Sequence, residues 1–462
     1  MRRMLAEAIV DFLSFSGNAS DHLNEIGGFH HRDWEHTLNW LRDAGLSFYL
    51  LQKLKDTNAT DILPKSALSR LEDNLKVNRR RVARLSRQFN SLNQKFDAAG
   101  VKYVVVKGFS LVPQFCPDAS LRHQIDLDYL VNRQSLSVAQ HVLEAEGYFL
   151  KKHSTNEFVF LPQSAQVPVL ADEQSEEHAA YAVELHLAFW DSDLHIMFLA
   201  EPEFSVENIV NRRWQGVGFR ALPEEDAFLL QVIHAFHHLL TGWVRMSWLY
   251  EIGYFLNQQA TDTLLWGRIE RRVGSDPLLR EMLAVVTELS AQFFEAPLPS
   301  TFGKWVEDIR PTVRIWIRNY ARTWAFENQN AEVSLFSTDK LVLFLHQQYL
   351  SEASARRHLI RKRLVPLEQF FRRARSITTL SSTNSGERTR QLHRVLVRLL
   401  FHVTGSLRFF WEIPRWRRLN KATHPGLQTS VIQQPQISSV FRRVHHPPLS
   451  CKQDRAASEK AR

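Results

Sequence analysis

Strand signals in this sequence are concentrated in one stretch, between about residues 100 and 200, and helical patterns lie on both sides of it. Val101 to Val106 is a β-branched run directly after Gly100, which is typical of a buried strand. The further strand candidates are Ile125 to Val131, Phe158 to Leu161 and Tyr181 to Trp190. The pattern predicts an α+β fold, in which a small mixed sheet is flanked by N-terminal and C-terminal helical regions.

The helical patterns set the expected divisions of the chain. Trp34, Leu38 and Leu41 recur near helical spacing, and Pro223 precedes three acidic residues that suit the first turn of a helix. Residues 421–462 lack periodicity, so we expect a disordered tail there. The predicted divisions are an N-terminal helical region (1–99), an α/β core (100–220), a C-terminal helical region (221–420) and a disordered basic tail (421–462).

Composition excludes several classes of protein. The chain has two cysteines, Cys116 and Cys451, which rules out a disulfide scaffold and a Cys-rich zinc site and fits a reducing compartment. The apolar start is interrupted by Glu7 and Asp11, so no signal peptide is expected. The stretch from Val395 to Trp411 is too short and too charged to span a bilayer. We therefore expect a cytoplasmic protein without a transmembrane segment.

The net charge of +9 is concentrated toward the C-terminus, as in Arg361-Lys362-Arg363 and Arg415 to Arg418. Two interpretations stay open for these basic helices. They form a solvated surface with a basic tail, or they bind nucleic acid or an anionic surface.

The paired carboxylates of Asp126 and Asp128 indicate a chemical role for the sheet. Residues two apart in a strand point to the same face, so both carboxylates project together, while Ile125, Leu127 and Tyr129 face the packed side. Two neighbouring carboxylates repel each other, and a divalent cation with a preference for oxygen ligands relieves that repulsion. The sequence predicts a Mg²⁺ or Mn²⁺ site here.

The candidate strand at Tyr181 to Trp190 supplies a third carboxylate. The same alternation places Glu184 and His186 on one face, and Glu184 on a neighbouring strand would complete a three-carboxylate metal site. Such a site suits phosphoryl or nucleotidyl transfer, in which bound metals neutralise phosphate charge. Lys107, Gly108 and Ser110 follow the first strand as a candidate phosphate-binding turn, and Arg122 is positioned to contact a phosphate.

Taken in order, these motifs resemble a known family. Lys107-Gly108 after a strand, then Arg122, the Asp126-Leu-Asp128 strand, Gly147-Tyr148 and Glu184-Leu-His186 are similar to the uncharacterised nucleotidyltransferase family of the polymerase-β-like superfamily. The flanks are similar as well, with a tryptophan at Trp34, a histidine at His234, Arg245, and Trp248 to Glu251. The resemblance covers roughly residues 20 to 400.

The resemblance implies a reaction and a role for each residue. Asp126 and Asp128 would bind divalent metal, and Glu184 would be a shared ligand or the base that accepts the acceptor's proton. Lys107, Gly108 and Ser110 would form the phosphate turn, with Arg122 and His186 beside the nucleotide. The implied reaction moves a nucleoside monophosphate from an NTP, with ATP the expected one, to a hydroxyl of an acceptor that the sequence does not identify.

Alternatives remain at this stage. Phe109 stands where the wider superfamily has a small residue, so a catalytically inactive binding or assembly protein with the same fold is one alternative. A basic nucleic-acid or anionic-surface binder is the other. His186 could equally be structural, and His234 and His238 could pack rather than bind zinc. Arg245 could pair with Glu251 or reach the nucleotide. The sequence contains no G-x-S-x-G, P-loop or G-x-G-x-x-G motif in a suitable context.

Overall fold

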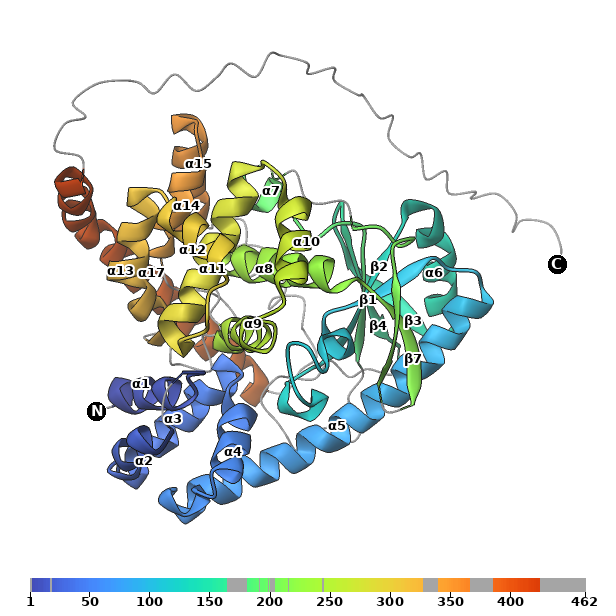
Figure 1. The fold of residues 1–462 in the computed structure, drawn as a ribbon, viewed down its shortest axis with the longest axis horizontal. Helices are drawn as coiled ribbons and strands as arrows, with labels where there is room; N and C mark the ends of the chain where they lie inside the picture. The colour runs from blue at the N-terminus through green and yellow to red at the C-terminus, as the bar shows by residue number, and fades with distance from the viewer. Residues whose placement is uncertain are drawn as a thin grey trace.

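The structure, a computed structural model, shows a mixed sheet beside a larger body of helices (Figure 1). It describes residues 2–423 apart from 17–18, 164–180, 191, 198, 200–203, 215, 243–244, 327–339 and 366–384. The predicted α+β class is therefore confirmed. The expected domain divisions stay predictions, and the tail from 424 onward lies outside the described residues.

Seven strands form one sheet in the order β3-β4-β5-β2-β1-β7-β6. β2 pairs antiparallel with β1 and parallel with β5, which places two strands far apart in sequence side by side. The strands are β1 (Tyr103–Val106), β2 (Asp126–Val131), β3 (Tyr148–His153), β4 (Glu157–Pro162), β5 (Ala182–His186), β6 (Val210–Trp214) and β7 (Val217–Ala221).

The two faces of the sheet pack against different cores. Leu127 and Tyr129 of β2 point into a core that the sheet shares with α5 (Lys65–Ala98) and α6 (Arg133–Ala145). Leu130 points the other way, into the core of the helical body. α6 begins where the sequence predicts, because the side chain of Asn132 accepts a hydrogen bond from the Ser135 amide.

The helices before and after the sheet form one body around a common core. The backbone amide of Phe15 donates to the Phe294 carbonyl at 2.8 Å, and the Trp40 indole donates to the Ala325 carbonyl at 3.3 Å. The N-terminal helices are α1 (Arg2–Phe12), α2 (Ala19–Gly27), α3 (His31–Ala44) and α4 (Ser47–Asp56). The C-terminal helices are α8 (Glu224–Thr241), α9 (Met246–Gln258), α10 (Thr263–Val273), α11 (Pro277–Phe294), α12 (Ser300–Glu307), α13 (Pro311–Phe326), α14 (Val342–His346), α15 (Ala353–Leu364) and α17 (Ser385–Thr423).

The long helix α5 connects the two cores. Its first turns bury Leu71 and Leu75 in the helical body, and its later turns bury Phe89 and Phe96 under the sheet. Figure 1 shows α5 running from the N-terminal helices along the sheet. This single helix therefore fixes the sheet relative to the helices that face it.

Two details differ from the sequence prediction. β2 begins at Asp126, so Ile125 precedes the strand and is 45% exposed instead of packed. β3, β6 and β7 were not predicted as strands; β6 and β7 lie beyond the predicted strand region, where Val210–Trp214 has two arginines and only weak alternation. Within the described residues, no helix combines the length and the apolar character that crossing a membrane requires.

Candidate metal and nucleotide site

The turn after β1 brings a lysine and a glycine to the edge of the sheet. Lys107 and Gly108 both have positive φ, 56° and 45°. Such a backbone is strained for lysine, and strain of this kind is concentrated at functional sites. At position 108 a Cβ atom would collide with the side chain of Gln124, whose amide donates to the Asp126 carbonyl at 2.9 Å. Gly108 is therefore required both by its φ and by the side chain that supports Asp126.

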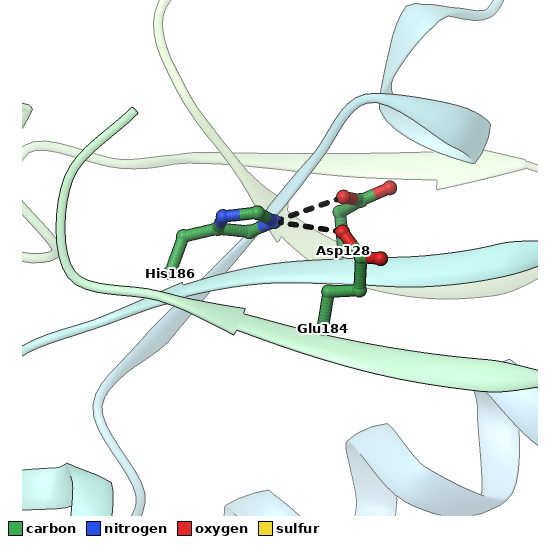
Figure 2. Close-up of side chains that lie close together, drawn as sticks. All are labelled: Asp128, Glu184 and His186. Atoms are coloured by element: carbon green, nitrogen blue, oxygen red, sulfur yellow. Dashed lines mark hydrogen bonds and ion pairs between the residues drawn. The ribbon is translucent and has the colours of Figure 1, made fainter. Parts of the chain in front are cut away.

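Neighbouring strands β2 and β5 place three ligand-type side chains together. Asp128 lies opposite Glu184, and Leu130 lies opposite His186, in the parallel register of the two strands. One side-chain ligand atom from each of Asp128, Glu184 and His186 lies within 4.8 Å of the other two (Figure 2). His186 Nε2 is 3.0 Å from Asp128 Oδ1 and 3.5 Å from Glu184 Oε2. The set of two carboxylates and one imidazole suits a divalent cation.

Asp126 lies at the edge of the same group and lines the same cavity. Burial raises the pKa of Asp126 to about 7, and the nearby Asp128 and Glu184 carboxylates add to that rise. Burial also acts to raise the pKa of Asp128, but Lys107 and His186 hold it below its ordinary value. Asp126 is therefore held partly protonated near neutral pH, and a cation bound beside it would favour its charged form.

Lys107 and His186 are the cationic partners of this group. Lys107 Nζ donates to Asp128 Oδ1 at 2.8 Å. Burial opposes the charge on Lys107, but Asp128 and Glu184 raise its pKa. Burial and Lys107 lower the pKa of His186, but hydrogen bonds to Asp128 and Glu184 bring it above its ordinary value. His186 therefore joins the carboxylates directly, although the sequence also allowed a purely structural role.

A cavity of about 460 Å³ opens in front of these side chains, within the range of small-molecule sites. The sheet supplies Asp126, Asp128, Glu184 and His186 to one side. Helices α8 and α9 supply the facing wall, which includes His234, His238 and Trp248. The site therefore lies between the sheet and the helical body.

Arg122 forms a buried ion pair across this boundary. Its Nε is 2.8 Å from Glu251 Oε1 and its Nη2 is 3.2 Å from Oε2, while Nη1 donates to the Gly108 carbonyl at 3.2 Å. Tyr49 also donates to Glu251, at 2.9 Å. Arg122 therefore holds the Gly108 turn to α9, and its contact with a phosphate stays a prediction.

Arg245 also lines the cavity, and sequence reasoning gave it little weight. Glu251 pairs with Arg122 and not with Arg245, which instead donates through Nη2 to the His123 carbonyl at 3.0 Å. Its buried Nε has no hydrogen-bond partner, and no ion pair to Arg245 occurs within the described part of the chain. Burial lowers its pKa. A buried guanidinium with an unused donor is suited to an anionic ligand. Its position shortly before Trp248-Leu249-Tyr250-Glu251 is the only sequence signal for it.

Two residues of the predicted phosphate turn point away from the cavity. The Ser110 hydroxyl donates to the Lys107 carbonyl at 2.7 Å, and Ser110 does not line the cavity. The Phe109 ring is buried under the sheet, stacked on Trp214 with ring centroids 4.5 Å apart. Phe109 therefore leaves the space before Lys107 and Gly108 open.

The facing wall is rich in histidines that favour the neutral form. Burial, followed by neighbouring basic groups, lowers the pKa values of His234 and His238 well below their ordinary range. Their rings contact each other and Trp248, with centroids 4.4 to 4.9 Å apart. In the part of the chain that is described, Asp128, Glu184 and His186 are the one group with metal-ligand geometry, so the two histidines pack and do not form a three-ligand zinc site.

His346, behind this wall, should make the protein sensitive to acid. Burial lowers its pKa to about 4, whereas an unfolded histidine has a pKa of roughly 6.5. Below pH 6.5 the unfolded chain therefore takes up a proton that the folded chain does not, and stability falls as the pH decreases toward 4. We expect the step from pH 7 to pH 5 to cost about 2 kcal/mol through this residue.

Urea unfolding of the wild type and His346→Gln at both pH values measures this cost. The variant should lose less stability between pH 7 and pH 5 than the wild type. The control is His31→Gln, which makes the same change at an exposed histidine on α3. Equal acid sensitivity of His346→Gln and the wild type would contradict the role of His346.

Comparison with known proteins identifies a family for this chain. No curated protein and no solved structure matches it. A family model described as an uncharacterised nucleotidyltransferase matches residues 30–295, which is more than half of the chain and contains every residue of the metal-ligand group. The chain therefore belongs to this family of uncharacterised nucleotidyltransferases.

Proposed function

We propose that the protein transfers a nucleoside monophosphate from an NTP to a hydroxyl of an acceptor, with a divalent metal held by Asp126, Asp128 and Glu184. The observation that carries the proposal is the convergence of Asp128, Glu184 and His186 at the sheet edge, beside the raised pKa of Asp126. We add His186 as a fourth ligand candidate, because its Nε2 faces both carboxylates. Because imidazole is a common ligand of transition metals, Mn²⁺ is as suitable here as Mg²⁺. The expected NTP is ATP.

In this reaction the acceptor oxygen forms a bond to the α-phosphorus, the bond from that phosphorus to the bridging oxygen breaks, and pyrophosphate leaves. A bound divalent cation would neutralise charge on the phosphate oxygens. Glu184 is our proposed acceptor of the hydroxyl proton. Its side chain is 20% exposed, against 4% for Asp128, so the proton can pass from Glu184 to solvent.

Cationic side chains around the cavity would hold the triphosphate. Lys107 reaches the carboxylates from the Gly108 turn, and Arg245, at the start of α9, forms no ion pair within the described residues. The neutral ring of Trp248 on the facing wall suits a nucleobase or another planar group.

We place the reaction in the cytoplasm, because the low cysteine content fits a reducing compartment.

Calorimetric titration with Mn²⁺, followed by ATP, GTP, CTP and UTP, tests the metal part of the proposal. We expect Mn²⁺ to bind the wild type and to strengthen NTP binding. Asp128→Asn should lose both effects, whereas Asp97→Asn, the same change on an exposed part of α5, should keep them. Binding that is independent of Mn²⁺, or unaffected by Asp128→Asn, would contradict the proposal.

Arg245→Gln should weaken NTP binding by roughly tenfold to a hundredfold, because charge-assisted hydrogen bonds to phosphate are lost. Mn²⁺ binding without nucleotide should be retained, since Arg245 donates to the His123 carbonyl and acts on the nearby Asp126 only through its charge. Arg268→Gln, in a half-exposed ion pair with Glu225, is the control and should leave NTP binding unchanged. Equal NTP affinity of Arg245→Gln and the wild type would remove Arg245 from the site.

A catalytically inactive binding protein with the same fold is the second candidate function. The observation in its favour is that the ammonium of Lys107 already lies 2.8 Å from Asp128 and can neutralise it without metal. If Lys107 replaces the cation, the wild type should bind no Mn²⁺, and Lys107→Ala should acquire Mn²⁺ binding. The same titrations therefore separate the two candidates.

A further inference from the structure

The C-terminal helix α17 carries an apolar stripe that faces solvent. Figure 1 shows the red end of this helix projecting at the edge of the helical body, and the helix contacts α13. The stripe consists of seven large side chains that are between 41% and 84% exposed: Leu396, Leu399, Leu400, Val403, Leu407, Phe410 and Trp411. Their spacing of three or four residues places them on one side of the helix.

The opposite side of α17 already has its packing partners. Phe409 stacks on Phe344 with ring centroids 4.7 Å apart, and Trp416 stacks on the same ring at 4.9 Å. Glu412 accepts a hydrogen bond from Tyr320 at 3.2 Å. The helix is therefore held on α13 and α14 by its inner side, and the exposed stripe is not needed for that contact.

The charge of α17 indicates what would cover the stripe. The helix has nine arginine and lysine residues and two glutamates, and one of these, Glu412, is turned toward Tyr320. In the last two turns, the side that carries the stripe continues into the exposed Arg417, Arg418 and Lys421. A second copy of this basic helix would be repelled by its charge. Surfaces that bind nucleic acid are mainly polar, so the exposed tryptophan and leucines do not suit one.

We propose that α17 is a docking surface for an anionic lipid bilayer. An interfacial helix lies in the membrane plane with leucine and aromatic side chains among the acyl chains and basic side chains at the headgroups. Phe410 and Trp411 lie next to the basic end, where aromatic residues suit the boundary between headgroups and acyl chains. The helix does not span the membrane, and the surface is separate from the metal-ligand group.

Flotation of the full-length protein with vesicles tests this surface. The protein should float with vesicles of phosphatidylcholine and phosphatidylserine, and much less with phosphatidylcholine alone or in high salt. Leu400→Glu and Trp411→Glu should each weaken binding by about tenfold or more. Arg417→Gln combined with Arg418→Gln should weaken it by about tenfold, and only on the anionic vesicles.

Leu264→Glu is the matched control, because Leu264 is 76% exposed on α10, away from the stripe. It should bind vesicles as the wild type does, and thermal melting should show that all variants stay folded. The proposal is overturned if the wild type does not prefer anionic vesicles, or if Leu264→Glu loses as much binding as Leu400→Glu. It is also overturned if Leu400→Glu only converts a dimer to a monomer, or if duplex RNA binds in place of vesicles.

Discussion

Asp128→Asn should lower nucleotidyl transfer by about 10³-fold or more, because it removes the carboxylate at the centre of the metal-ligand group. Asp128 is the side chain that contacts both Lys107 and His186. Asparagine has nearly the same shape, so the sheet should keep its packing while the charge is lost. The measurement is the initial rate of label transfer from an α-labelled NTP, together with circular dichroism and thermal melting of both proteins.

Asp97→Asn is the control, since Asp97 is half exposed and pairs with Arg220 at the other end of the sheet region. Its rate should equal that of the wild type. A chelator should abolish the wild-type rate, and Mn²⁺ should restore it in the wild type but not in Asp128→Asn. An Asp128→Asn protein that stays folded and keeps more than about a tenth of the rate would be incompatible with our assignment of the site.

Glu251→Gln should lower the free energy of unfolding by roughly 3–5 kcal/mol, the typical cost of breaking a buried ion pair. The side chain of Arg122 is 13% exposed and that of Glu251 is 4% exposed. After the substitution the Arg122 guanidinium would stay buried without its charged partner. Because Arg122 also holds the Gly108 carbonyl, we expect weaker NTP binding as well. Urea unfolding and NTP titration of the same preparation measure the two effects.

The control for this change is Glu225→Gln, which breaks the ion pair with the 40% exposed Arg268. Exposed pairs contribute little, so its cost should stay below about 1 kcal/mol. Arg122→Met combined with Glu251→Leu should recover much of the stability, because neither charge is then buried alone. It should not recover NTP binding, since the Gly108 turn still lacks its support. Equal costs for Glu251→Gln and Glu225→Gln would show that burial of the pair is unimportant.

Local patterns in the sequence were sufficient to predict strands β1, β2, β4 and β5 and part of the candidate site. The alternation around Asp126 and Asp128, and around Glu184 and His186, predicts side chains on one face, and the parallel register of β2 and β5 places them there. Asn132 marks the start of α6 for an equally local reason, because a capping side chain bonds the helix that follows it.

Contacts between segments that are far apart in the chain could not be predicted from the sequence. Arg122 pairs with Glu251, which is 129 positions away, and no local pattern distinguishes this from a phosphate contact. The shared core of the N-terminal and C-terminal helices, and the histidine wall opposite the carboxylates, depend in the same way on tertiary packing. The inward direction of Phe109 likewise follows from Trp214 on β6, a strand that the pattern did not indicate.

Comparison of α-labelled with γ-labelled ATP tests the central claim most directly. Each label is incubated with the full-length protein, Mn²⁺ and a cell extract as the source of acceptor, with Asp128→Asn run in parallel. Nucleotidyl transfer predicts that the α-label enters a product with the wild type, that the γ-label leaves as pyrophosphate, and that Asp128→Asn transfers neither. Transfer of the γ-label, or equal transfer of the α-label by Asp128→Asn and the wild type, would contradict the proposed reaction.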